Sequence, residues 1–326
     1  MFAYCGGVRL ERVRDIELKR KMSVSHLIDS FSVAGGFTAR KIAIAAGILN
    51  EMIDRCEVRF LSFPACIVAT GTRGVIRTLV KEMMMNVLIT TCGTLDHDIA
   101  RSLKHYYHGD FFMDDCELRK KGINRLGNVL VPDESYGQCI ERWAQGVLKE
   151  IYDRRGACTL STSELCFELG KRLPEESILY WCWKNSIPVY VPGITDGAFG
   201  CQLWLFMQRC KGFRVDVFKD EDELSGLIFP LQEKHTGALI IGGGISKHHT
   251  IWWNQFKGGL NYAVYLTTAE EYDGSLSGAR LREGVSWGKV HPKAKFITVE
   301  GDATITLPML TAYLIDKRKK GGTRCV

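Results

Sequence analysis

The stretch Ala238-Leu239-Ile240-Ile241-Gly242-Gly243-Gly244 contains the pattern that decides the fold of this chain. Four apolar residues run directly into three glycines, which is typical of a buried parallel strand that ends in a tight turn. Similar short apolar runs recur along the chain and alternate with longer segments of helical type. This alternation predicts an α/β protein with a doubly wound, mostly parallel, Rossmann-like sheet and helices on both faces.

The expected strands of this sheet are at residues 66–70, 87–91, 188–191, 238–241, 262–266 and 296–299. The helices expected around them are at residues 73–84, 95–103, 200–208, 253–257 and 303–314. We expect residues 1–22 to be an N-terminal extension, residues 23–318 to form a single domain, and residues 319–326 to be a basic tail.

Composition excludes several classes of protein. The chain has 326 residues with a net charge of +6 and no run of five like charges, so nucleic-acid binding is not expected. No stretch of 18 apolar residues occurs, so no membrane span is expected. The 12 cysteines include no Cys-x-x-Cys pair, so no metal site is expected. Cysteines within apolar runs suggest reduced, buried thiols and therefore a cytoplasmic protein.

Small residues follow five of the expected strands. The turns are Cys92-Gly93-Thr94, Thr195-Asp196-Gly197, Gly242-Gly243-Gly244, Thr267-Thr268-Ala269 and Gly301-Asp302-Ala303. The carboxyl ends of parallel strands share one edge of a sheet, and glycines and helix N-termini suit phosphates there, so we expect a dinucleotide site. The absence of a Gly-x-Gly-x-x-Gly motif disfavours a standard hydroxyacid or alcohol dehydrogenase. Ordinary α/β turns remain the alternative.

Lys289 is the candidate nucleophile. It lies two residues after Trp287 and six after Glu283. An apolar wall favours the neutral form of a lysine amine, which could then form an imine with a carbonyl-like group. His248 and His249 follow the triple glycine, where such a pair is more often structural than catalytic.

At these residues the chain resembles the deoxyhypusine synthase family. The matching motifs are Gly242-Gly243-Gly244-Ile245-Ser246-Lys247-His248-His249, Asn261-Tyr262-Ala263-Val264-Tyr265, Thr268-Ala269-Glu270-Glu271-Tyr272-Asp273-Gly274-Ser275, Ser277-Gly278-Ala279-Arg280 and Val285-Ser286-Trp287-Gly288-Lys289. Further matches are at residues 122–128 and 195–197, and the resemblance extends from about residue 27 to residue 314.

The resemblance implies an NAD-dependent reaction. The family oxidises spermidine and transfers its aminobutyl group to an active-site lysine and then to a lysine of translation initiation factor 5A. Its members are tetramers whose active sites combine residues of two subunits. Lys289 falls on the nucleophile position. The polyamine-site positions are His248, Tyr265, Glu283 and Trp287. The NAD-site positions are Thr91, Gly93, Asp196, Gly243, Thr268, Ala269, Asp273, Gly274, Asp302 and Ala303.

Several positions depart from the family pattern. Two acids that hold the polyamine in the family are replaced here by Cys201 and Leu276. The loss of one charged partner of a buried cation costs roughly 2–5 kcal/mol. The family's acid for the adenosine ribose falls near His97, although Asp96 and Asp98 flank it. These losses leave the lysine in place but weaken the groups that deliver substrate to it.

The departures lead to three hypotheses. The first is a catalytically impaired regulatory subunit, a pseudoenzyme with little or no activity alone, that activates a catalytic paralogue in a heterotetramer. The second is an active homotetrameric deoxyhypusine synthase with Lys289 as nucleophile. The third is a non-catalytic module that senses NAD or polyamines.

Overall fold

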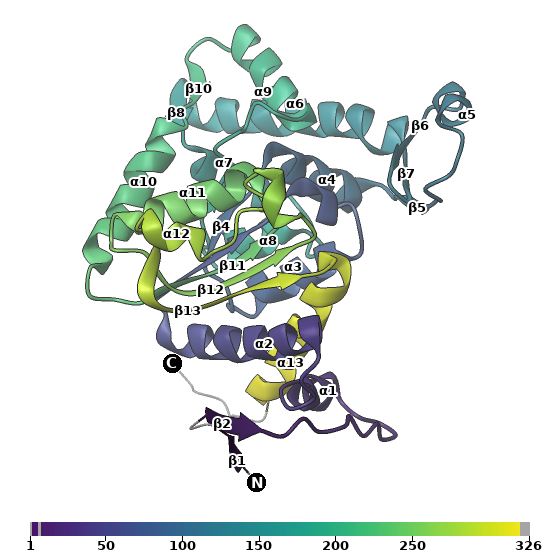
Figure 1. Ribbon diagram of the computed structural model, residues 1–326. Helices are drawn as coiled ribbons and strands as arrows, with labels where there is room; N and C mark the ends of the chain where they lie inside the picture. The colour runs from purple at the N-terminus through teal and green to yellow at the C-terminus, as the bar shows by residue number, and fades with distance from the viewer. Residues whose placement is uncertain (1, 6–7, 320–326) are drawn as a thin grey trace.

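A six-stranded sheet forms the centre of the computed structural model, which describes residues 2–5 and 8–319 (Figure 1). Its strands, in spatial order, are β13 (Val290–Glu300), β12 (Leu260–Thr267), β11 (Thr236–Ile241), β3 (Val58–Ser62), β4 (Val87–Ile89) and β9 (Val189–Tyr190). All neighbouring pairs are parallel. Every residue of β11 is buried, as expected for a strand covered on both faces. The predicted doubly wound α/β sheet is confirmed.

The strand order reverses between β3 and β11. From β3 the chain adds β4 and β9 on one side, and later β11, β12 and β13 on the other. The turns after these two central strands lie close together, because a Cβ atom added at Gly242 would lie 3.4 Å from Cγ of Pro64. Ligands of open α/β sheets bind at such a reversal, outside the carboxyl ends of the strands.

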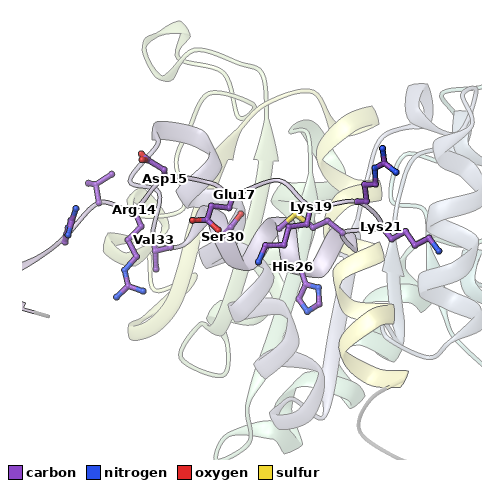
Figure 2. A pocket seen from close by; sticks show the side chains of 12 residues that line it. Arg14, Asp15, Glu17, Lys19, Lys21, His26, Ser30 and Val33 are labelled. Atoms are coloured by element: carbon purple, nitrogen blue, oxygen red, sulfur yellow. The ribbon is translucent and has the colours of Figure 1, made fainter.

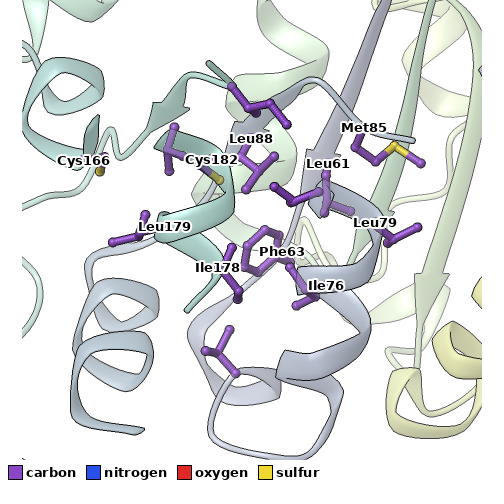
Figure 3. Close-up of a cluster of buried hydrophobic side chains, with 14 of the residues drawn as sticks. Leu61, Phe63, Ile76, Leu79, Met85, Leu88, Cys166, Ile178, Leu179 and Cys182 are labelled. Atoms are coloured by element: carbon purple, nitrogen blue, oxygen red, sulfur yellow. The ribbon is translucent and has the colours of Figure 1, made fainter. Parts of the chain in front are cut away.

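One face of the sheet packs against a broad layer of helices. α2 (Phe37–Arg55), α3 (Thr72–Lys81), α8 (Ile178–Lys184) and α13 (Ala303–Lys319) contribute buried apolar residues to this core, and α1 (Val24–Phe31) packs on α2 and α13. Figure 3 shows part of this core, where Leu61 and Leu88 of the sheet meet Ile76 and Leu179 of the helices. The residues that alternate with them, such as Phe60, point to the opposite face.

The opposite face is covered by α10 (Phe218–Ile228), α11 (Gly244–Gln255) and the short α12 (Glu283–Ser286) (Figure 1). Leu224 and Ile228 of α10 and Ile251 and Trp253 of α11 pack there on alternate residues of the strands. α11 begins directly at the triple glycine, where Gly242 and Gly244 have φ values of +64° and +78°. Only glycine adopts this left-handed conformation without strain, so the glycines allow a strand to turn sharply into a helix.

Most of the remaining elements surround one end of the sheet, whereas the N-terminal hairpin lies on the other side of the molecule, near α1 (Figure 1). The remaining elements are α4 (Cys92–Leu103), α6 (Gly137–Arg155), α7 (Thr162–Gly170), α9 (Ala198–Arg209), the parallel pair β8 (Cys158–Leu160) and β10 (Phe213–Val215), the antiparallel strands β5 (Tyr107–His108), β6 (Ile123–Leu126) and β7 (Val129–Pro132), α5 (Asp115–Lys120), and the hairpin β1 (Phe2–Cys5) and β2 (Val8–Glu11). The described residues also form four short 3-10 turns, η1 (Ala65–Ile67), η2 (Asp133–Ser135), η3 (Phe229–Leu231) and η4 (Glu271–Asp273).

The strand predicted at residues 66–70 is wrong. The first strand of the sheet is β3, and the apolar run that follows it forms η1. Cys66 is exposed, but Ile67, Val68 and Ala69 are buried without strand pairing. The Arg101 guanidinium donates hydrogen bonds to the carbonyl groups of Val68 and Thr70 and so satisfies backbone groups that a strand would have paired. The other five predicted strands overlap β4, β9, β11, β12 and β13. The predicted helix at residues 253–257 overlaps only the end of the longer α11.

The predicted extension at residues 1–22 precedes α1 and consists of β1, β2 and an irregular segment that runs from residue 12 to residue 23. The predicted basic tail at residues 319–326 lies outside the described residues, apart from the end of α13 at Lys319. No helix in the described part of the chain is long and apolar enough to cross a membrane.

Candidate active site

A pocket of about 320 Å³ lies between α11 and the segment that connects β12 to β13. Its lining residues are Lys247, His248, Ile251, Trp252, Leu276, Ala279, Arg280, Leu281, Glu283, Gly284, Trp287, Lys289 and Val290. The structure therefore brings together four of the predicted site residues, His248, Glu283, Trp287 and Lys289, and the replaced position Leu276. Sequence reasoning missed Trp252, Lys247 and Arg280 as parts of the site.

Lys289 is fixed between two regular elements. It follows α12 and precedes the first residue of β13, and its backbone N–H donates to the Gly284 carbonyl at 2.9 Å. Gly288, with φ +69°, makes the turn that ends α12 and directs the next side chain inward. Lys289 is only 8% exposed. The lysine thus lies at the amino end of β13, along α11, whereas the small-residue turns lie at the opposite edge of the sheet.

His248 is the nearest polar partner of Lys289. Its Nε2 atom lies 3.3 Å from Lys289 Nζ. Burial and the neighbouring charge of Lys289 lower the pKa of His248. A neutral imidazole nitrogen accepts a hydrogen bond from an ammonium group, so this pair can pass a proton from the lysine to the histidine.

Two indole rings form the apolar wall beside the lysine. Lys289 Nζ lies 5.1 Å from the ring centroid of Trp287 and 5.7 Å from that of Trp252. Trp252 follows His248 by one turn of α11, and the two rings stack with centroids 5.8 Å apart. The i, i+4 spacing of His248 and Trp252 was the available sequence signal for this contact.

The loop after η4 is held by a buried lysine of α11 and a tyrosine of β12. Lys247 is 2% exposed, and its Nζ donates to the carbonyl oxygens of Leu276 and Ala279, both at 2.6 Å. The ammonium also lies 4.0 Å from the ring centroid of Tyr265, whose hydroxyl donates to the Ser277 carbonyl at 2.6 Å. Burial lowers the pKa of Lys247 to about 8. Tyr265 therefore holds this loop, and it is not among the residues that line the pocket.

Gly243 leaves space for the same loop. A Cβ atom at this position would lie 2.3 Å from Ser277 Oγ and 2.4 Å from its Cα. The close approach that this glycine permits is to the chain itself.

Residues 26–314 match the family model described as deoxyhypusine synthase. The chain belongs to the deoxyhypusine synthase family. It is 54% identical over 303 residues to the probable deoxyhypusine synthase of Picrophilus torridus, covering 93% of this chain and 96% of that one. It is 53% identical over 301 residues to the probable deoxyhypusine synthase of Thermoplasma acidophilum, covering 92% and 96% of the two chains.

A solved structure from Entamoeba histolytica, assigned to the deoxyhypusine synthases, shares the fold with a TM-score of 0.62. The two chains are 19% identical, and the match covers 93% of this chain and 97% of the other. At this identity the likeness concerns the fold alone.

Cys201, predicted from the sequence to replace a polyamine-binding acid, lies apart from the lysine pocket. It is exposed on α9 in a separate hollow that also involves Asp133, Tyr136 and Glu141. This hollow shares no lining residue with the Lys289 pocket. Leu276, in contrast, lines that pocket directly, with 41% of its surface exposed.

The predicted NAD-site residues lie on the turns after the strands. Thr91 precedes the first residue of α4, and Gly93 lies in its first turn; Gly243 precedes α11, and Ala303 begins α13. Asp196, Thr268, Asp273, Gly274 and Asp302 are exposed, and Ala269 is half-buried. Helix N-termini carry unpaired N–H groups and a partial positive charge, and no side chain caps α4 or α11, so the starts of these two helices could hold a pyrophosphate. At the start of α13, Asp302 already accepts a hydrogen bond from the Thr304 N–H.

The carboxylates that flank His97 are both buried and already hydrogen-bonded to the starts of other helices. Asp96 is fully buried and accepts hydrogen bonds from the backbone N–H groups of Ala198 and Phe199, at the start of α9. Asp98 is fully buried as well and accepts from the N–H groups of Ile178 and Leu179, at the start of α8. Both carboxylates accept hydrogen bonds from the first N–H groups of a helix and are buried, so neither can hold a ribose diol.

A larger cavity, of about 1010 Å³, lies under the N-terminal segment (Figure 2). It is lined by residues of that segment, such as Arg14 and Lys19, and by His26 and Ser30 of α1. None of its lining residues comes from a strand end or from the Lys289 pocket.

Proposed function

We propose that this chain catalyses transfer of an alkylamine group through Lys289, in a reaction of the deoxyhypusine synthase type. The observation that carries the proposal is the contact between Lys289 and His248, in which the amine of the nearly buried Lys289 lies 3.3 Å from the imidazole Nε2 atom. The pocket adds one carboxylate, Glu283, for the cationic end of a donor amine and an aromatic wall for its alkyl chain.

The residues of the pocket support a defined sequence of bonds. When bound, NAD supplies the hydride acceptor for oxidation of the donor amine. Lys289 Nζ adds to the carbon of the resulting C=N bond. The original nitrogen of that bond then leaves as part of an amine. One proton passes from Lys289 to the leaving nitrogen, and His248 can carry it because it contacts the nucleophile. The transferred group is then an imine on Lys289. The amine of the acceptor lysine adds to the imine carbon, Lys289 leaves as the free amine, and the hydride held by the reduced cofactor would reduce the new C=N bond.

The proposed cofactor is NAD, held at the turns around Gly93, Gly243, Thr268 and Asp302. Their glycine and helix N-terminal positions suit the pyrophosphate. The adenosine ribose needs a partner other than Asp96 and Asp98. The proposed acceptor protein is translation initiation factor 5A, and the proposed compartment is the cytoplasm; membership of the family supports both proposals.

The test is covalent trapping on the chain alone. The purified protein is incubated with NAD and spermidine, reduced with borohydride and digested, and the mass of the peptide with Lys289 is measured. We expect an added aminobutyl group on Lys289 and its loss in Lys289→Ala. Lys293→Ala is the matched control, because Lys293 is exposed on the same strand. A lone chain that neither forms the adduct nor modifies the factor would contradict the proposal.

The second candidate is the regulatory subunit. The observation that favours it is the pair of replaced acids, Leu276 in the pocket and Cys201 on α9. In this case the chain pairs with a catalytic paralogue in a heterotetramer and completes a site whose reacting lysine the paralogue supplies. It predicts no activity in the lone chain, and activity on co-expression that survives Lys289→Ala. Activity of the isolated chain would exclude it.

A further inference from the structure

The pocket around Lys289 holds more positive than negative groups. Glu283 is the one carboxylate among its lining residues, all of which belong to the described part of the chain, whereas Lys247, Arg280 and Lys289 are cationic. Arg280 is partly neutralised, since its Nε lies 3.9 Å from Glu271 and 3.8 Å from Glu300. A ligand with several ammonium groups would still meet a single carboxylate within this pocket, and a buried cation needs a paired anion.

The lining of the pocket offers aromatic faces in addition to the carboxylate of Glu283. Trp252 and Trp287 are 41% and 65% exposed, so both indoles present free surface to the pocket. Their position suits a cation, because the Lys289 ammonium already lies within 6 Å of both ring centroids. Stacking on His248 fixes the Trp252 ring, which therefore needs little reordering on binding.

The side chain of Leu276 adds an alkyl group to this wall. Its carbonyl is held by Lys247 and its side chain lines the pocket, so the loop cannot easily turn a different group toward the ligand. A terminal ammonium beside Leu276 would lose water without gaining an anion.

We propose that the donor is a secondary alkylamine with fewer positive charges than spermidine. Its internal ammonium lies against Trp252 and Trp287, one terminal ammonium binds Glu283, and an uncharged end lies along Leu276. The inference rests on the proposed function, because it names the donor in the Lys289 reaction. Trp252 and Leu276 are then specificity-determining residues of this pocket.

Three amines with one common skeleton test the charge preference. They are spermidine, N-propylputrescine, which lacks one terminal ammonium, and N-butylpropylamine, which lacks both. Their Kd values are measured by titration calorimetry on the full chain in its native assembly with NAD present. We expect N-propylputrescine to bind at least as tightly as spermidine. N-butylpropylamine should bind about tenfold more weakly than N-propylputrescine, the fold-change for loss of one charge-assisted contact of about 1.4 kcal/mol.

Leu276→Asp should shift the preference toward spermidine by about tenfold, whereas the matched neutral variant Leu276→Asn should not. Trp252→Leu should raise the Kd of N-propylputrescine about fivefold to tenfold, and Trp252→Phe by less than about threefold, because only the second keeps an aromatic face. Equal losses in the two tryptophan variants would overturn the role of the ring. Spermidine binding to the wild type tenfold tighter than N-propylputrescine would overturn the inference, and would indicate an anion supplied by a neighbouring copy.

The two proposals fail in different ways. Trapping on Lys289 together with a clear preference for spermidine would leave the lysine chemistry intact and refute the donor class. Preference for N-propylputrescine without any adduct on Lys289 would support the pocket and refute the proposed function.

Discussion

Replacement of Lys247 by methionine tests whether the loop over the pocket is held by one buried ammonium. Lys247 donates two hydrogen bonds of 2.6 Å to the carbonyl oxygens of Leu276 and Ala279. Hydrogen bonds from a charged group contribute about 1.5–3 kcal/mol each. Against this, burial lowers the pKa of Lys247 from 10.5 to about 8, which corresponds to a cost of about 3 kcal/mol for the charged form.

Near pH 7 this cost offsets half or more of the roughly 3–6 kcal/mol that the two hydrogen bonds contribute together. We therefore expect Lys247→Met to lower the free energy of unfolding by only about 0–3 kcal/mol. The loop should nevertheless lose its position, because no other side chain binds both carbonyl groups. Leu276 and Ala279 line the pocket, so the KM of the donor amine should rise about tenfold or more.

The free energies of unfolding of the wild type and of Lys247→Met should also diverge at high pH. The pKa of Lys247 is lower in the folded chain than in the unfolded one, so between pH 8 and 10.5 the unfolded chain binds more protons. The contribution of Lys247 to the free energy of unfolding therefore rises through this window by up to about 3 kcal/mol, and the methionine variant lacks this rise. Urea unfolding followed by circular dichroism at pH 7.5 and pH 10 measures the difference.

Lys257→Met is the matched control. Lys257 is also buried, and its Nζ donates to the Gly259 carbonyl and to Asn261 Oδ1, away from the pocket. This variant should change stability without changing the KM of the donor. An unchanged KM in Lys247→Met, or an equal rise in both variants, would refute the reasoning that Lys247 positions the loop.

Three further substitutions test other parts of the site and its support. His248→Gln should lower the rate of Lys289 adduct formation about 10–100-fold. In the wild type this rate should begin to fall only below pH 6.5 as the solution is acidified, because the pKa of His248 is lowered. Adduct formation followed over time by borohydride trapping between pH 5 and 8 measures both effects. Asp98→Ala should destabilise the chain by about 3–5 kcal/mol in urea unfolding, because it leaves the buried Arg73 unpaired. Gly243→Ala should raise the KM of the donor, because the new Cβ would lie 2.3 Å from Ser277 Oγ; an unchanged KM would mean that the loop adjusts freely.

The sequence predicted the sheet well where apolar runs end in small residues. β11 and β12 are buried on both faces, so their side chains form continuous apolar runs that are easily recognised. The strand predicted at residues 66–70 failed because the same apolar signal arises from η1, whose neighbouring carbonyl groups bond to Arg101. Periodicity reports burial, and it does not report where the backbone groups find partners.

The motif that contains Lys289 predicted a lysine that lies in a pocket of the structure, but the shape of that pocket could not be predicted. Trp252 and Lys247 reach the site from α11, and their contacts are to a loop that lies 29 or more residues further along the chain. Their roles depend on which side of α11 faces this loop, which only tertiary packing decides. The acids beside His97 illustrate the same limit, because Asp96 and Asp98 resemble ribose ligands in the sequence and cap helices in the structure.

The loop after η4 connects the proposed dinucleotide site to the Lys289 pocket. Its contacts explain how the side chain at position 276 can change while the backbone of the loop stays in place. Asp273 and Gly274 lie at its start, near the strand ends where a dinucleotide is proposed, whereas Leu276 and Ala279 line the lysine pocket. The backbone between them is held by Lys247 and by the hydroxyl of Tyr265, neither of which depends on the side chain at position 276. A leucine can therefore replace an acid there while the lysine pocket keeps its shape. Such a substitution changes which amine the pocket accepts, and for this reason the charge of the donor distinguishes altered specificity from lost activity.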